Sequence, residues 1–114
     1  MSTESVISRH LNAIPQGTDA IVADYANDAV LITQDAVFHA PAEIRRFFEG
    51  FMANASPELL AAFTVTRLET QGEVGFLLWK AEPFIPLATD TFVVRDDRIV
   101  AQTFAMLARV AANA

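Results

Sequence analysis

The chain has 114 residues and no cysteine, which excludes disulfides, thiolate catalysis and cysteine-bound metals. Its net charge of −6 and its eight scattered lysine and arginine residues argue against a nucleic-acid partner. No apolar run approaches the ~18 residues of a membrane span, and no basic segment precedes an apolar one at the N-terminus, so we expect a cytoplasmic protein without a membrane partner.

The first half of the chain is predicted to be mainly helical, within a single domain over residues 1–114. Apolar spacing and turn residues predict helices over about 3–14 and 18–25, a longer one from Pro41, and one more turn over 56–60. In the longer helix Ile44, Phe47, Phe48 and Phe51 follow the i, i+3, i+4, i+7 spacing of one face. We therefore expect Phe47 and Phe51 to be largely buried against a sheet.

The second half reads as strands, which predicts an α+β fold with helices on one face of an antiparallel sheet. Strands are expected over 29–33, 36–40, 62–70, 74–82, 87–95 and 98–110. The strand over 74–82 is apolar on both faces, because Phe76 and Leu78 alternate with Leu77 and Trp79. Helices cover one face, and a second copy of the chain is the simplest cover for the other.

Asp90 is an unusual residue for the middle of a strand, where aspartate is depleted. It shares strand parity with the apolar residues Phe92 and Val94, whereas Thr89, Thr91, Val93 and Arg95 share the opposite, more polar face. Period-two alternation therefore predicts that Asp90 points inward.

The inward face of the last strand depends on the turn at Asp96-Asp97. A clean two-residue turn would pair Asp90 with Thr103 and place Ile99, Ala101 and Ala105 on its face. A single β-bulge would instead bring Val100, Gln102, Phe104 and Met106 inside. Both alternatives fit the sequence.

Three stretches together carry a family resemblance: "DYANDAVLI" (24–32), "APAEIRRFFEGF" (40–51) and "TDTFVVRDDRIVAQTF" (89–104). In order and spacing they resemble the SnoaL-like branch of the nuclear transport factor 2-like superfamily. The resemblance implies a cone-shaped, strongly curved antiparallel sheet wrapped around N-terminal helices. It also implies an apolar pocket and frequent homodimers, and it implies no metal or organic cofactor.

By this resemblance Asp90 falls where ketosteroid isomerases carry the acid of their oxyanion hole. A carboxyl group in apolar surroundings resists ionisation and can donate a hydrogen bond. The isomerase base would fall at about Thr33, which cannot exchange a proton near neutral pH. The isomerase tyrosine on the first helix has no counterpart, and His10 is the nearest inward polar group there.

The expected site combines an acid with apolar walls. Its candidate catalytic residues are Asp90 as acid or hydrogen-bond donor and His10 or His39 as base; its candidate ligand-binding residues are Tyr25, Thr33, Phe47, Trp79, Phe92 and Gln102. The spacing of the two histidines matches no metal motif. For His39 a solvent-facing role, for Tyr25 helix-end packing and for Trp79 core packing are the structural alternatives.

The sequence thus predicts a SnoaL-like protein that binds a small hydrophobic molecule. If it is an enzyme, acid-base isomerisation, cyclisation or dehydration of a carbonyl or ring compound is the expected chemistry. The alternative is a non-catalytic ligand-binding or dimeric association module. Two or more polar groups converging near Asp90 would favour the enzyme, and Asp90 alone in an apolar cavity would favour binding.

Overall fold

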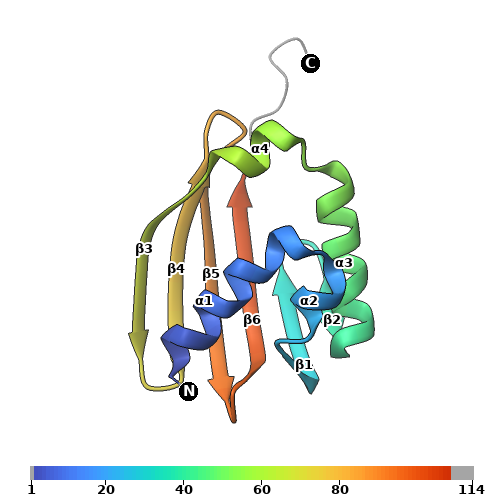
Figure 1. Ribbon diagram of the computed structural model, residues 1–114, viewed down its shortest axis with the longest axis vertical. Coiled ribbons are helices and arrows are strands. Elements are labelled where there is room, and N and C mark those ends of the chain that lie inside the picture. The colour runs from blue at the N-terminus through green and yellow to red at the C-terminus, as the bar shows by residue number, and fades with distance from the viewer. Residues whose placement is uncertain (1, 109–114) are drawn as a thin grey trace.

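Helices cover one face of a single six-stranded sheet in the computed structural model, which describes residues 2–108 (Figure 1). The helices are α1 (Thr3–Ala13), η1 (Ile14–Gln16), α2 (Thr18–Val22), α3 (Ala40–Asn54) and α4 (Pro57–Ala62). The strands are β1 (Tyr25–Thr33), β2 (Val37–His39), β3 (Phe63–Gln71), β4 (Val74–Ala81), β5 (Ile85–Arg95) and β6 (Arg98–Leu107). The expected last strand ran to residue 110, and its residues 109 and 110 lie outside the described residues.

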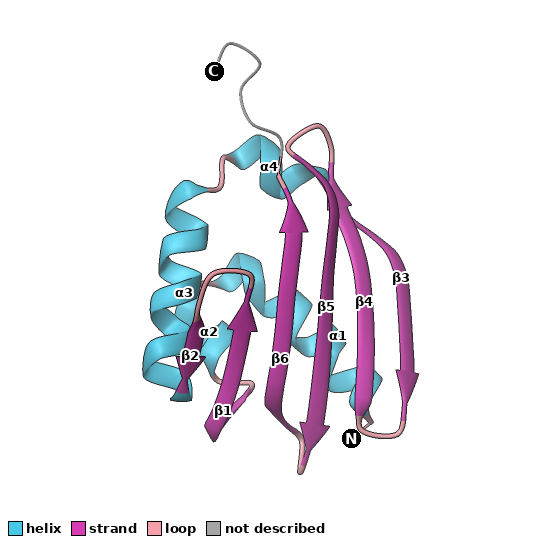
Figure 2. Ribbon diagram, turned by 180° about the vertical axis from the view of Figure 1, so that it is seen from behind, coloured by secondary structure: helices cyan, strands magenta, loops and turns pink. Residues whose placement is uncertain are grey.

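The sheet is curved and open, with strand order β2-β1-β6-β5-β4-β3 (Figure 2). Neighbouring strands are antiparallel except β1 and β6, which run parallel. This pairing corrects two expectations, the purely antiparallel sheet and the second helix over 18–25. Tyr25 lies opposite Ile99, and the Ile99 amide donates to the Asp24 carbonyl at 2.8 Å, so strand pairing takes up the segment that was expected to end a helix.

A β-bulge in β6 decides which residues of the last strand face inward. Asp96 and Asp97 both have positive φ, the conformation of a tight hairpin turn. Val94 lies opposite Ile99 and Val93 opposite Ala101, so Val100 is the extra residue and Asp90 pairs with Phe104. Gln102 and Phe104 are therefore buried, as the bulged alternative predicted.

Helix α3 begins at a proline-containing first turn and packs its apolar face on the sheet. The Glu43 carboxylate accepts from the His39 amide at 2.7 Å, which satisfies one free N–H at the helix start. Ile44 and Phe48 are buried. Phe47 and Phe51 are half-buried and line a cavity, which corrects the expectation that they are largely buried against the sheet.

Helix α1 begins at Ser2, whose hydroxyl accepts from the Ser5 amide at 3.1 Å, and it crosses the sheet closely at Gly75. A Cβ added to Gly75 would lie 2.2 Å from Cδ1 of the fully buried Ile7. The glycine on β4 therefore sets how near the helix approaches.

Replacement of Gly75 by alanine should lower the free energy of unfolding by about 1–3 kcal/mol, because a packed core resists an added methyl group. Gly50→Ala is the matched control, since nothing lies within 4 Å of the Cβ added there. That control, inside α3, should raise stability by roughly 0.5–1 kcal/mol. Urea unfolding of both variants measures the difference, and a Gly75→Ala protein as stable as wild type would contradict the close packing.

No helix among residues 2–108 lies on the outer face of the sheet, as Figure 2 shows. Phe76 and Leu78 of β4 are half-buried on this face, and Val74 is 46% exposed. Among residues 2–108 no helix is long and apolar enough to cross a membrane.

Candidate functional site

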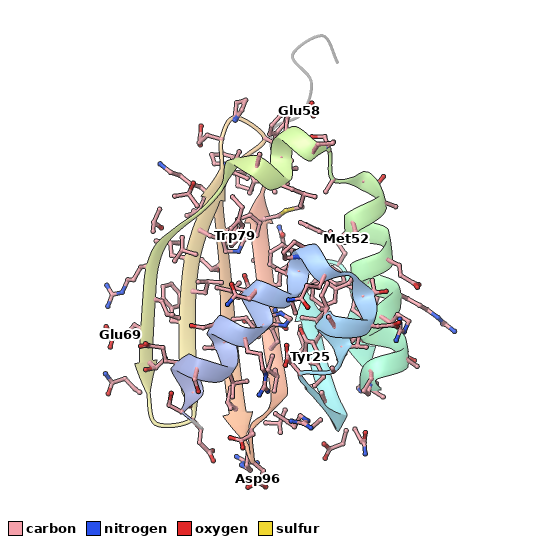
Figure 3. All side chains as sticks on the ribbon, in the orientation of Figure 1. Tyr25, Met52, Glu58, Glu69, Trp79 and Asp96 are labelled. Atoms are coloured by element: carbon pink, nitrogen blue, oxygen red, sulfur yellow. The ribbon has the colours of Figure 1, made fainter. Side chains whose placement is uncertain are left out.

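A cavity of about 510 Å³ lies between the inner face of the sheet and the segments α1–η1, α3 and α4. Trp79 of β4 and Met52 of α3 both line it, and both lie below α4 in the view of Figure 3. Most of the lining is aliphatic or aromatic; its polar side chains are His10, Asn12, Asp90 and Gln102. This is the composition of small-molecule sites, in which a few polar groups orient an apolar ligand.

Aromatic rings form the walls of the cavity. The Trp79 and Phe104 rings are stacked at 6.2 Å with an interplanar angle of 4°, and Phe63 lies 4.9 Å from Trp79. Phe47 and Phe51 of α3 meet Phe104 edge-on at 5.9 and 6.2 Å. Rings from three strands and one helix thus enclose the same space, in the offset and edge-to-face arrangements that aromatic rings prefer.

Asp90 is the acid of this cavity and is only 6% exposed. The Trp79 indole Nε1 donates to its Oδ1 at 2.8 Å, and the Gln102 amide Nε2 donates to its Oδ2 at 2.8 Å. The inward direction predicted from strand parity places it beside Phe92, which is 1% exposed. Both oxygens accept a hydrogen bond, which is the arrangement of an ionised carboxylate.

Burial raises the pKa of Asp90 from 3.8 to about 6, and the Trp79 and Gln102 hydrogen bonds and the charge of His10 oppose the rise. Desolvation disfavours the charged form, while donated hydrogen bonds favour it. A pKa near 6 leaves most of the carboxyl ionised at pH 7. The expectation of a neutral donor is therefore revised toward a carboxylate that accepts.

Polar contacts continue from Asp90 through Gln102 and Tyr25 to His10. Oε1 of Gln102 accepts a short hydrogen bond from the Tyr25 hydroxyl. The same hydroxyl lies 3.5 Å from Nε2 of His10, and the His10 and Tyr25 rings meet edge-on. Burial, followed by the charges of Asp90 and Asp24, raises the pKa of Tyr25 well above its usual value, so the hydroxyl keeps its proton.

Asp24 ends this chain of contacts and was not predicted from the sequence. Its Oδ1 accepts from Nε of Arg9 at 2.7 Å, and its Oδ2 lies 3.7 Å from Nδ1 of His10. Burial acts to raise the pKa of Asp24, but the hydrogen bonds and charges of His10 and Arg9 lower it overall. Residue 24 was expected inside a helix over 18–25, where a single acid carries no pattern that indicates burial, yet Asp24 is only 4% exposed.

The structure brings together most of the predicted site residues. Six of them line the cavity: His10, Phe47, Trp79, Asp90, Phe92 and Gln102. Tyr25 lies behind Gln102 in the core. The sequence reasoning missed lining residues that come from helix ends and turns, among them Asn12, Phe51, Met52 and Phe63.

Two predicted residues lie elsewhere. Thr33 is at the end of β1, where its hydroxyl accepts from the Ala36 amide at 3.2 Å and stabilises the turn to β2. His39 is exposed at the start of α3. Neither belongs to the cavity lining, because the short β1–β2 hairpin turns both away from it. Within residues 2–108 no three His, Cys, Asp or Glu side chains are grouped to hold a metal ion.

The architecture is the nuclear transport factor 2-like fold, and solved structures of that kind superpose over nearly the whole chain. An NTF-2 like protein of unknown function from Burkholderia xenovorans LB400 covers 96% of this chain and 86% of its own, with 16% identity and a TM-score of 0.74. A Sinorhizobium meliloti protein, named only provisionally as a polyketide cyclase, covers 88% and 93%, with 19% identity and a TM-score of 0.71.

A third similar structure, from Catenulispora acidiphila DSM 44928, has a ketosteroid isomerase-like fold and was solved in complex with trimethylamine. It covers 87% of this chain and 82% of its own, with 10% identity and a TM-score of 0.66. No family model matches the chain, and no curated protein matches its sequence significantly. At these identities the similarity establishes the fold.

Proposed function

We propose that the protein binds a small, mostly apolar molecule in the aromatic cavity and that Asp90 exchanges a proton with it. The observation that best supports this proposal is a buried carboxyl group that lines a cavity of about 510 Å³ and has its pKa raised to about 6. A general base works best when its pKa lies near the working pH. Asp90 meets this condition, and each of its oxygens keeps a further lone pair for a ligand proton.

The reaction class that fits this site is acid-base chemistry on a carbonyl or ring compound, such as isomerisation, cyclisation or dehydration. Trp79 and Gln102 converge on Asp90, and His10 also lines the cavity, so an acid and a base share one space. Similar structures are described as ketosteroid isomerase-like and, provisionally, as a polyketide cyclase. A cytoplasmic location remains part of the proposal.

A general-base probe tests this role without knowledge of the natural substrate. 5-Nitrobenzisoxazole is a small apolar ring compound; a base removes its C3 proton, the N–O bond breaks, and a coloured cyanonitrophenolate forms. The protein should accelerate this elimination with saturation, and the rate should rise with pH through about 6. Asp90→Asn should lower the rate by about 10²–10⁴-fold.

Asp35→Asn is the control, because Asp35 is an exposed acid in the β1–β2 turn, outside the cavity lining. Its rate should equal that of wild type. Equal rates for wild type and Asp90→Asn would contradict the proposed role of Asp90 as a base.

A non-catalytic binding module is the second candidate, and one observation favours it. Both oxygens of Asp90 already hold N–H donors from the protein, as a purely structural acid would. The two candidates separate in the same experiment, because Trp79 is the only tryptophan of the chain and lies in the cavity wall. A saturable change in its fluorescence without turnover of the probe would support binding alone.

We also propose a homodimer formed through the outer face of the sheet. Half-buried Phe76 and Leu78 beside exposed Val74 leave an apolar strip there that a second copy would cover. Sedimentation at micromolar concentration should give twice the 12.5 kDa mass of the chain, and Phe76→Glu should give the mass of one chain. Wild type sedimenting as a single chain would contradict this assembly.

A further inference from the structure

We infer that Asp90 and His10 share one proton, and that Tyr25 and Gln102 form a reversible hydrogen-bond relay that couples their protonation. The inference rests on the proposed function only for its use in catalysis. The relay itself follows from the directions of the hydrogen bonds.

The directions are fixed from the Asp90 end. Gln102 donates to Asp90 through Nε2, so its Oε1 faces Tyr25 and must accept. Tyr25 has one hydroxyl proton, and this proton goes to Oε1. The Tyr25 oxygen is therefore free to accept, and the group beside it is Nε2 of His10 at 3.5 Å. With Asp90 ionised, Nε2 of His10 carries a proton.

The other nitrogen of His10 also needs a proton. Nδ1 of His10 and Oδ2 of Asp24 face each other at 3.7 Å, and both are buried with no hydrogen-bond partner among residues 2–108. A bare nitrogen lone pair against a carboxylate oxygen would leave two buried acceptors in contact, which is costly. A proton on Nδ1 turns this contact into an ion pair. Two further rings, those of Phe48 and Phe92, meet the His10 ring edge-on and carry no charge.

A second arrangement of the same groups satisfies every member with all directions reversed. When Asp90 is protonated, its O–H donates to Gln102, whose amide turns so that Oε1 accepts and Nε2 donates to Tyr25. Tyr25 then donates to Nε2 of His10, which must have lost its proton, and Nδ1–H still donates to Asp24. Asp90 gains one proton and His10 loses one. Tyr25 and Gln102 keep theirs, and the net charge is unchanged.

The coupling matches the needs of an isomerisation. When Asp90 removes a proton from the substrate and His10 returns one at another atom, the four groups are left in the second arrangement. Asp90 and His10 both line the cavity, so each exchanges its proton with bound substrate there. Tyr25 and Gln102 act as positioning residues, because they reach the substrate only through these two.

Ring nitrogen NMR of His10 tests the relay. In wild type at pH 7 both nitrogens of His10 should be protonated. Asp90→Asn places an N–H₂ donor where Oδ2 was and should force the reversed arrangement, so the Nε2 signal should shift to the unprotonated range while Nδ1 stays protonated. His39, exposed and the only other histidine, is the internal reference and should not change.

The Tyr25→Phe background removes one hydroxyl and so distinguishes an effect on His10 that passes through the relay from an effect of the lost Asp90 charge. There Asp90→Asn should leave the His10 signals unchanged, and Gln102→Leu gives the same test if that double variant does not fold. An unprotonated Nε2 in wild type, or an equal response with and without the hydroxyl, would overturn the inference. Failure of the benzisoxazole probe alone would remove the proposed function and leave the relay standing.

Discussion

Replacement of Phe48 by alanine should lower the free energy of unfolding by about 3–5 kcal/mol, the usual cost of removing a buried phenylalanine ring. Phe48 is 7% exposed, and its ring packs edge-on against Phe47 at 5.1 Å and against His10 at 5.9 Å. The ring therefore supports both the core and the far end of the relay. Guanidinium unfolding of the two proteins measures the loss.

Phe47→Ala is the matched control, because it removes the same atoms from the adjacent position of the same helix. Phe47 is half-buried against the cavity, so its removal enlarges an existing space and should cost less than half as much. Equal decreases in the free energy of unfolding at the two positions would show that α3 is rotated about its axis and packs a different face on the sheet.

The free energy of unfolding of Asp90→Asn, relative to that of wild type, should rise by about 2–3 kcal/mol between pH 4 and pH 7. The folded-state pKa of Asp90 is raised from 3.8 to about 6, so the unfolded chain ionises first as pH rises. Below the unfolded pKa both states are protonated and the acid costs nothing. Wild type loses stability as pH rises through this window, whereas the variant has no carboxyl group to ionise.

The measurement is urea unfolding of both proteins at each pH. Glu73, whose pKa is lowered by its hydrogen bond to Arg95, titrates in both chains and cancels from the difference. The free energy of unfolding of the variant should rise relative to that of wild type as pH rises, and the difference should level off once the pH exceeds the folded-state pKa of about 6. A difference that does not vary with pH would mean that Asp90 is not desolvated.

Local pattern was enough to predict most of the fold. Period-two alternation placed Asp90 and Phe92 on the inner face, and helical spacing found α1 and the start of α3 to within one residue. These signals are strong because each side chain's direction follows from its own strand or helix. The inward acid was predicted for the same reason.

Long-range pairing accounts for what could not be predicted. The parallel pairing of β1 with β6 joins segments far apart in sequence and turns the expected end of the second helix into strand at Tyr25. The bulge at Val100 is a choice of register, and the sequence left both registers open. Gln102 reaches Asp90 only because of that choice.

The relay was hidden for a related reason. Its members lie on α1, β1, β5 and β6 and in the α2–β1 connection, and no spacing along the chain relates Asp24 to His10 or Tyr25 to Gln102. Thr33 was expected near the site because the resemblance places the isomerase base at about that position, and His39 because histidine is a common general base. The β1–β2 hairpin takes both away from the cavity.

Carboxyl-carbon NMR titration of Asp90 tests the central claim most directly, because the proposed chemistry depends on a desolvated acid in the cavity that ionises near neutral pH. The structure predicts a midpoint at about pH 6 for this carboxyl, with the indole N–H signal of Trp79, its hydrogen-bond partner, shifting over the same range. A midpoint at or below 3.8, the ordinary value for aspartate, would show an acid that is solvated or paired with a cation and would contradict the account.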